Sequence, residues 1–276
     1  MKEEILFLTH KKNKEIENAI RSLRDSMGDR KLTIVSQSQP FDIEGTDLFL
    51  FDESIVQQMD FPTIGNSIIP GHAHFPVFAY IGNNKTNADY YWVIEYDVRF
   101  SGKWSVLFDH FTQFNADFLT SHIRYFHEEP DWYWWKEMNH REITISREKR
   151  VRSFNPIYRI SSEAFKFLEK AFKSGWKGHN EVLLTTLLFH HGYQLLDFGG
   201  NGDFVSDRNK FYISRSSGQQ GLSTGTMRYR PAMKTHGMRK NKLYHPVKEE
   251  NGLGILRSNA GNFYRLIKIW FNNMRR

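Results

Sequence analysis

Two acidic side chains near the end of one aromatic stretch are the strongest candidates for chemistry in this sequence. Glu95 and Asp97 lie in residues 89–100, a run dense in aromatic and β-branched residues that is typical of a buried strand. If the strand continues through both residues, alternation puts the two carboxylates on the same side. Such charges are costly beside aromatic rings unless a cation neutralises them, and a hard divalent cation takes oxygen ligands. The pair therefore predicts a metal site, the alternative being that these acids pair with Arg99 or Lys103.

Three consecutive residues, His179, Asn180 and Glu181, form a second candidate group. They follow two glycines and begin an apolar stretch, residues 180–190, whose composition predicts a helix. Backbone N–H groups and the positive end of the helix dipole are exposed at such a start. A carboxylate there can act as a general base toward an acceptor hydroxyl. The alternative is an acid that only interacts favourably with the helix dipole.

The third candidate is His245, which stands directly before a proline and three residues before Lys248. A histidine fixed in this way can bind a metal through a ring nitrogen, and the lysine can contact a phosphate. The alternative is an ordinary turn histidine.

Positive charge is concentrated in the segment that contains this histidine. Residues 208–248 hold ten Lys or Arg residues and no Asp or Glu, whereas the whole chain has a net charge of +7, so the remainder is at 7 − 10 = −3. Residues 216–226 are rich in Gly, Ser and Thr, which is typical of a flexible loop. We expect this basic segment to close over phosphates, the alternative being a solvated basic loop.

The elements that must position these residues indicate one α/β domain of 276 residues. Strands are expected at residues 5–9, 32–35, 48–51, 89–100 and 116–120, and helices at 13–27, 77–81, 104–111, 161–172 and 180–190. Because the chain has no cysteine, disulfides, thiolate metal sites and cysteine nucleophiles are excluded.

In this order, the motifs resemble those of metal-dependent glycosyltransferases of the GT-A fold. The acidic motif of that family, usually Asp-X-Asp, matches Glu95-Tyr96-Asp97; its acidic helix-start motif matches His179-Asn180-Glu181; and its C-terminal metal-binding histidine matches His245. The wider strings 92–102 and 244–248 look like those of bacterial enzymes that build surface polysaccharides such as lipopolysaccharide or capsule. The resemblance covers about residues 1–250.

The resemblance implies a Rossmann-like, mixed and mostly parallel sheet flanked by helices, and sugar transfer from a nucleotide diphosphate sugar, with a UDP-sugar favoured. Asp97 and His245 would hold Mn²⁺ or Mg²⁺, and Glu95 would either coordinate the ion as well or contact the ribose or sugar. Glu181 would deprotonate the acceptor hydroxyl, which implies inversion at the anomeric carbon. The acceptor would be a glycan or a lipid-linked glycan.

Further residues are expected to bind the two substrates. The donor-binding candidates are His10, Asp52, Arg228, Arg230 and Lys248. The aromatic cluster in residues 131–136 is interpreted as a stacking platform for the acceptor, the alternative being a core or partner-contact patch. The acceptor-binding candidates are Trp132, Trp134, Trp135 and His179.

Two histidines in a Pro/Gly loop, His72 and His74, are a weaker candidate for a zinc site. Zinc needs three or four ligands, and no third ligand is near in the sequence. We therefore expect them to be surface or substrate-contacting residues.

The two ends of the sequence indicate where in the cell the protein is expected. The N-terminal apolar run is too short for a secretory leader, so the chain is expected in the cytoplasm. Residues 251–276 are expected to form an amphipathic basic helix that lies on the anionic inner face of the cell membrane or docks on the catalytic domain 1–250. Nucleic acid is not the expected partner, because no recognition signature accompanies the basic segment. A nucleic-acid-binding protein and a metal-dependent nucleotidyltransferase or phosphohydrolase are the competing functions.

Overall fold

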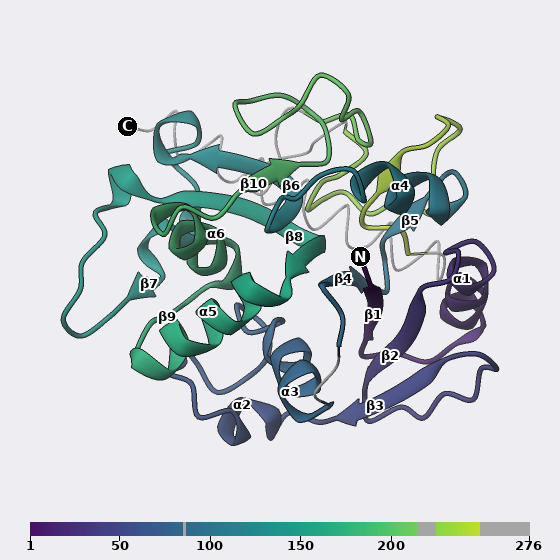
Figure 1. Ribbon diagram of the computed structural model, residues 1–276, viewed down its shortest axis with the longest axis horizontal. Coiled ribbons are helices and arrows are strands. Elements are labelled where there is room, and N and C mark those ends of the chain that lie inside the picture. Colours follow the sequence, from purple (N-terminus) through teal and green to yellow (C-terminus); the bar gives the residue numbers. More distant parts are fainter. Residues whose placement is uncertain (85–86, 215–224, 249–276) are drawn as a thin grey trace, which may run out of the picture.

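A seven-stranded sheet forms the centre of the computed structural model, which describes residues 1–84, 87–214 and 225–248 (Figure 1). The strand order is β10-β6-β8-β4-β1-β2-β3, and every strand is parallel to the others except β8. The bounds of these strands are β1 (Glu3–Thr9), β2 (Lys31–Gln37), β3 (Asp47–Phe51), β4 (Tyr90–Glu95), β6 (Phe118–Tyr125), β8 (Val151–Ser161) and β10 (Leu195–Asp197). The mixed, mostly parallel sheet predicted from the sequence is therefore confirmed.

Helices pack on both faces of the sheet. One apolar cluster joins one side of β1, β2 and β4 to α1 and α4, and a second joins the other side to α2, α3, α5 and α6. Their bounds are α1 (Lys14–Arg24), α2 (Ile55–Gln58), α3 (Phe75–Asn84), α4 (Trp104–Phe111), α5 (Ser162–Ser174) and α6 (Asn180–His190), with 3₁₀ turns η1 (Phe126–Glu128), η2 (Tyr133–Lys136) and η3 (Arg147–Lys149). Because both faces are covered, the central strands are apolar on both sides rather than alternating.

Four short strands form two small pairs beside the main sheet. They are β5 (Arg99–Phe100), which pairs antiparallel with β11 (Leu243–Tyr244), and β7 (Met138–Asn139), which pairs antiparallel with β9 (Lys177–Gly178). The first pair attaches the end of the basic segment to the sheet, and the second leads directly into α6.

The prediction of one continuous strand over residues 89–100 is wrong, because a turn interrupts it. Strand β4 ends at Glu95, and the N–H of Val98 donates to the carbonyl of Glu95 at 3.0 Å, which closes a turn before β5 begins. Asp97 lies in this turn. Strand alternation therefore does not bring Glu95 and Asp97 together; the turn does.

Strand β8 was missed because its sequence is polar and contains a proline. Its pairing with β4 covers only residues 157–161, and its pairing with β6 shifts register twice. Pro156 has no N–H to donate, so a central strand is interrupted there. As a result, the first half of β8, including Asn155, runs past the end of β4.

Parts of the sequence-based picture lie outside the described residues. These are the proposed C-terminal helix at 251–276 and most of the Gly/Ser/Thr-rich loop, residues 215–224. Among the described helices, none combines the length and the apolar character needed to cross a bilayer.

Candidate active site

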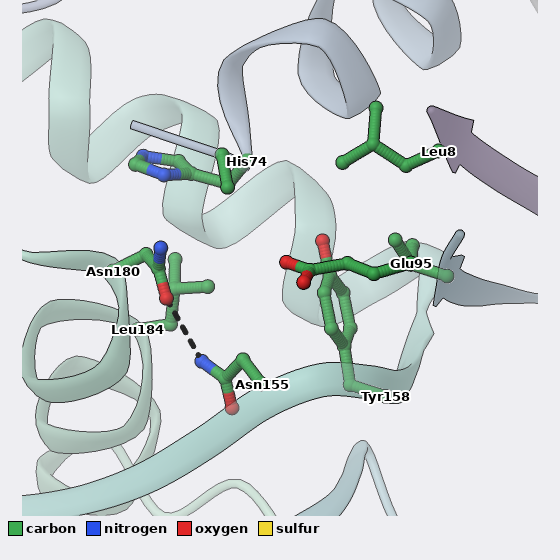
Figure 2. Close-up of a pocket in the computed structure, with 9 residues that line it drawn as sticks. Leu8, His74, Glu95, Asn155, Tyr158, Asn180 and Leu184 are labelled. Carbon is green, nitrogen blue, oxygen red and sulfur yellow. Dashed lines mark hydrogen bonds between the residues drawn. The ribbon is translucent and has the colours of Figure 1, made fainter. Parts of the chain in front are cut away.

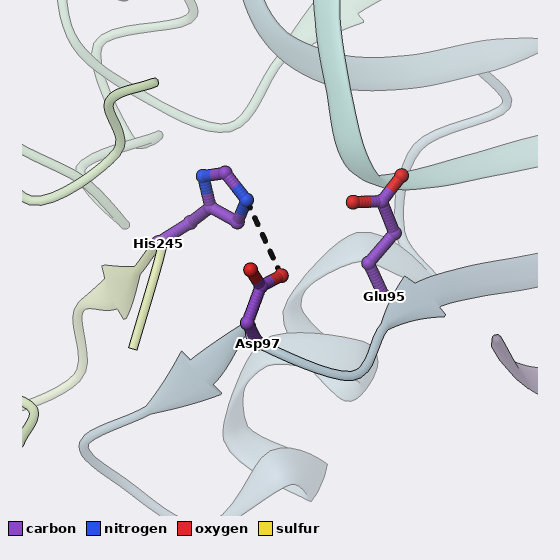
Figure 3. A group of neighbouring side chains, drawn as sticks. All are labelled: Glu95, Asp97 and His245. Carbon is purple, nitrogen blue, oxygen red and sulfur yellow. Dashed lines mark ion pairs between the residues drawn. The ribbon is translucent and has the colours of Figure 1, made fainter. Parts of the chain in front are cut away.

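The three predicted metal ligands meet at the carboxyl end of β4 (Figure 3). Each of Glu95, Asp97 and His245 offers one ligand atom, and these atoms all lie within 4.8 Å of one another. Glu95 ends β4, Asp97 lies in the following turn, and His245 follows β11. The N–H of Val247 donates to the carbonyl of Asp97 at 2.8 Å, so backbone bonds hold the two segments together.

One ring nitrogen of His245 is fixed by the backbone, which leaves the other to face the acids. Nδ1 lies 2.8 Å from the carbonyl oxygen of Arg228. A carbonyl only accepts hydrogen bonds, so Nδ1 carries the hydrogen. Nε2 lies 3.3 Å from Oδ1 of Asp97. This arrangement, a backbone carbonyl orienting a histidine, is the one that prepares Nε2 as a metal ligand.

The charge state of Asp97 follows from its neighbours. Burial alone raises the pKa of its carboxyl, but the charges of His245, Lys248 and Arg99 outweigh burial and bring the pKa below its ordinary value. Lys248 Nζ lies 3.7 Å from Oδ2. Burial lowers the pKa of His245, yet Asp97 and Glu95 together raise it above the ordinary value.

The residues present fit a divalent cation. Oδ1 of Asp97 is buried, and the His245 imidazole lies beside it in an ion pair at 3.3 Å. A buried carboxylate is costly unless a cation lies beside it; a protonated His245 fills that role in the free protein, and a divalent ion bound by all three residues would fill it in the loaded one. Two carboxylates with one imidazole suit Mn²⁺ better than Mg²⁺, which prefers oxygen ligands alone.

Glu181 lies at the same corner, on the start of α6. The helix begins at Asn180, and its N-cap is His179, whose Nδ1 accepts from the N–H of Glu181 at 3.4 Å. The backbone N–H of Asn155 donates to the Glu181 carboxylate. Burial raises the pKa of Glu181 to about 7, against the opposing charge of Arg152. Asn155, in the part of β8 that runs past the end of β4, therefore lies next to Glu181.

The pKa of Glu95 connects the two acidic centres. Burial raises it to about 7, and the charges of Asp97 and Glu181 contribute in the same direction. Glu95 is therefore close enough to both Asp97 and Glu181 for their charges to act on it.

The aromatic cluster divides into a buried part and an accessible part. Trp132 and Trp135 are 4% and 2% exposed, and their rings pack against each other at 5.2 Å, so they offer no open face to a sugar. Trp134 is half-buried and stacks on His179 with a centroid distance of 4.5 Å and an angle of 22°. This places one aromatic ring directly above the N-terminus of α6.

Two of the predicted donor-binding residues lie beside the acidic pair. His10 is exposed at the end of β1, and its ring meets Tyr96 edge-on at 4.7 Å. Lys248 contacts Asp97, as described above. Both side chains face the carboxyl end of the central strands.

The other three donor-binding candidates have different neighbours. Asp52 is exposed and accepts from the N–H of Ser54 at 2.8 Å, at the end of the edge strand β3. The guanidinium of Arg228 donates to backbone carbonyls, including that of Pro231 at 2.9 Å. Arg230 stacks over its neighbour Tyr229 at 4.6 Å. The contacts just described for these three side chains are with neighbours other than Glu95, Asp97 and His245.

His72 and His74 were expected to be surface or substrate-contacting residues, and the first of these alternatives is wrong. They are 1% and 2% exposed, because the loop that carries them packs between α3 and α6 and contacts α5. Asn155 and Tyr158, which no motif indicated, also line the space behind Glu95 (Figure 2). The Asn-Pro pair at 155–156 was the one sequence signal of an irregular strand here.

Solved structures match this chain, whereas no family model and no curated protein sequence does. The galactosyltransferase LgtC, in complex with donor and acceptor sugar analogues, is 12% identical, with a TM-score of 0.43 over 70% of this chain and 72% of that one. An active-site mutant of LgtC is 12% identical, with a TM-score of 0.44 over 74% and 80%. Mouse xyloside xylosyltransferase 1, in its apo form, is 12% identical, with a TM-score of 0.41 over 71% and 84%.

Proposed function

We propose that this protein is an inverting, metal-dependent glycosyltransferase that moves a sugar from a nucleotide diphosphate sugar to a hydroxyl of a glycan or lipid-linked acceptor. The observation that supports it best is the triad of Glu95, Asp97 and His245, whose ligand atoms all lie within 4.8 Å of one another. When bound there, Mn²⁺ or Mg²⁺ would offset the negative charge that develops on the departing diphosphate.

Side chains of this chain supply the remaining steps. Glu181, when ionised, takes the proton of the acceptor hydroxyl as that oxygen attacks the anomeric carbon. The bond from the anomeric carbon to the diphosphate oxygen breaks on the opposite side, so the new glycosidic bond has the inverted configuration. Lys248, beside Asp97, adds positive charge next to the leaving diphosphate.

Substrates are expected on the two sides of Glu95. The nucleotide is placed near His10 and Tyr96, and the acceptor near Trp134 and His179, because a pyranose C–H face packs well on an aromatic ring. Trp132 and Trp135 support this platform from the core rather than contacting sugar themselves. A role in bacterial surface polysaccharide synthesis, at the inner face of the membrane, is part of the proposal on the strength of the motifs at 92–102 and 244–248.

The decisive experiment measures release of UDP from UDP-sugars in Mn²⁺, with and without candidate glycan acceptors. The wild-type protein is expected to release UDP, and Asp97→Ala to lose at least about 100-fold of that rate, since a metal ligand and its charge are removed. Asp207→Asn, a change at an exposed acid, serves as the control. Full activity in Asp97→Ala would contradict the proposed metal dependence of the reaction.

A further inference from the structure

A buried histidine in β6, His122, has an unusual backbone conformation. Its φ angle is 51°, in the left-handed region that glycine adopts freely and other residues seldom do, and its side chain is fully buried. The pairing of β6 with β8 shifts register on both sides of Ser121, so β6 is irregular at this point. Residues in such conformations persist only where the surrounding structure fixes them, and they are frequent at functional sites.

Two hydrogen bonds fix this irregular part of β6 from a neighbouring segment. The N–H of His122 donates to the Tyr212 hydroxyl at 3.0 Å, and the N–H of Ile123 donates to Oδ2 of Asp197 at 2.9 Å. The side chains of Tyr212 and Asp197 are buried and hydrogen-bonded to each other. The backbone of His122 is therefore fixed by residues outside β6.

This backbone directs the imidazole of His122 to a second segment, residues 226–228. Nε2 lies 3.0 Å from the carbonyl oxygen of Met227. Since a carbonyl only accepts hydrogen bonds, Nε2 carries the hydrogen. Burial lowers the pKa of His122 to about 3, and the charges of Arg124 and Arg152 contribute in the same direction. The ring is therefore neutral, and its single N–H donates to Met227.

Residues 226–228 are the segment that fixes His245. The N–H of His245 donates to the carbonyl of Thr226 at 2.9 Å, and the N–H of Arg228 donates to the carbonyl of His245 at 3.1 Å. The carbonyl of Arg228 also accepts from Nδ1 of the His245 ring at 2.8 Å. The segment therefore sets both the backbone and the ring of His245, whose other nitrogen faces Asp97 (Figure 3).

An aromatic ring gives a second connection between the two histidines. The Phe154 ring centre lies 6.0 Å from that of His122 and 5.2 Å from that of His245, both in edge-on geometry. Phe154 is buried, in the half of β8 that runs past the end of β4. A displacement of His122 would therefore reach His245 through packing as well as through Met227.

We infer that His122 is a positioning residue for the metal site: through Met227 it fixes residues 226–228 in the place that presents Nε2 of His245 to Asp97 and Glu95. The inference rests on the proposed function, because it assigns His122 to the binding of the divalent cation. A residue that only filled space in the core would not need an N–H donor. The test therefore removes the donor and leaves the rest of the site intact.

Two variants of His122 differ in how far their amide donor reaches. His122→Asn introduces a residue that tolerates the left-handed backbone, but its amide is too short to reach the Met227 carbonyl. His122→Gln suits that backbone less well, but its amide extends to about the position of Nε2. Mn²⁺ affinity is measured by calorimetry and by electron paramagnetic resonance. It is expected to fall at least about 10-fold in His122→Asn and to stay within about 3-fold of the wild type in His122→Gln.

A control variant and a second readout separate positioning from stability. Thr33→Val removes a buried hydroxyl that donates to Glu4 at 3.0 Å, outside the triad and residues 226–228. It is expected to lower stability toward urea and to leave Mn²⁺ affinity unchanged. In the metal-free protein, amide hydrogen exchange at Arg228 and His245 is expected to become at least about 10-fold faster in His122→Asn but not in His122→Gln or Thr33→Val.

The outcomes separate this inference from the proposed function. If His122→Asn binds Mn²⁺ as tightly as the wild type, the inference is overturned while the proposed function stands. If Thr33→Val weakens Mn²⁺ binding as much as His122→Asn does, lost stability explains the effect, and the inference is again overturned. If the wild-type protein binds no Mn²⁺, the metal dependence of the proposed function fails and the inference fails with it. If His122→Asn does not fold, Tyr212→Phe, which removes the acceptor of the His122 N–H, is decided by the same two measurements.

Discussion

Asp97 is the residue on which the metal assignment depends. It combines a lowered pKa, burial and contacts to His245 and Lys248. Glu95, two residues earlier, has the opposite shift, since burial and neighbouring negative charge raise its pKa to about 7. Asp97 is therefore ionised at neutral pH because positive groups lie close to it, whereas Glu95 is partly protonated at that pH.

The first prediction concerns Asp97→Asn. This change keeps the size of the side chain and removes its charge, so Mn²⁺ affinity, measured by calorimetry or by electron paramagnetic resonance, is expected to fall at least about 10-fold. Asp207→Asn is the control, because Asp207 is exposed and lies outside the triad. Unchanged Mn²⁺ affinity in Asp97→Asn would show that the ion binds elsewhere.

A second prediction follows from the pKa of about 7 at Glu181. Below this pH the carboxyl is protonated and cannot take the proton of the acceptor hydroxyl. We therefore expect kcat/KM to rise with pH and to level off above about 7. Glu181→Gln should lower the rate by about 10²- to 10⁴-fold and leave a residual rate that is flat across this range. A residual rate that still rises with pH would assign the titration to the metal ligands instead.

At the scale of the elements, α6 is positioned by a close backbone approach. Gly178 in β9 faces β7 so tightly that a Cβ atom would lie 2.2 Å from the carbonyl oxygen of Glu137. The next residue, His179, donates its N–H to that same carbonyl at 2.7 Å. The start of α6, and with it Glu181, therefore depends on a glycine at this position.

The third prediction is that Gly178→Ala impairs catalysis by displacing the start of α6, although it removes no group that takes part in the reaction. The backbone must shift to admit the methyl group, which is expected to cost about 1–3 kcal/mol of stability and, by displacing the base, to lower kcat at least about 10-fold. Gly82→Ala in α3 is the matched control, because nothing lies within 4 Å of its added Cβ. Urea denaturation and steady-state kinetics measure the two effects. Equal kcat in both variants would contradict the prediction.

Local sequence signals predicted the regular elements well. Helix α4 begins and ends where its apolar spacing indicated, and the N-termini of α5 and α6 lie at the expected residues. Strand β8 was not predicted, because its buried arginines, Arg152 and Arg159, read as surface residues. Their charges are neutralised by Glu129 and Glu3, partners 23 and 156 residues away, which no local pattern reveals.

The difference between local sequence signals and long-range contacts also explains which candidate site residues the sequence indicated. Glu95, Asp97, Glu181 and His245 each lie at an element boundary with a local signature, so the sequence indicated them as candidates. The small cavity behind Glu95 is lined partly by the loop that carries His74 and partly by strand β8. The burial of that loop follows from tertiary packing, which no local pattern reveals, so the sequence did not exclude a surface position for His74.

At the scale of the whole molecule, the two halves of the sheet and the basic segment meet in one place. Strand β4 and the turn after it carry Glu95 and Asp97, α6 carries Glu181, and residues 243–248 return from the end of the described chain to lie against Asp97. The ion and the diphosphate are therefore expected to bridge segments far apart in sequence. Ligands that bind only the folded state stabilise it by RT ln(1 + [L]/Kd), which is about 2.7 kcal/mol at a concentration of 100 Kd.

The fourth prediction is that UDP and Mn²⁺ stabilise the fold together by more than the sum of their separate effects. The ion lowers the repulsion between the diphosphate and the acidic pair, and the diphosphate completes the ligand shell of the ion. Thermal unfolding is measured with Mn²⁺, with UDP and with both, in the wild-type protein and in His245→Ala. The variant keeps both acids and loses the ligand that ties residues 243–248 to them, so the extra stabilisation by the pair should shrink while any effect of UDP alone remains. Strictly additive shifts in the wild-type protein would mean that the ion and the diphosphate bind at separate places, and the triad would then not be the donor site.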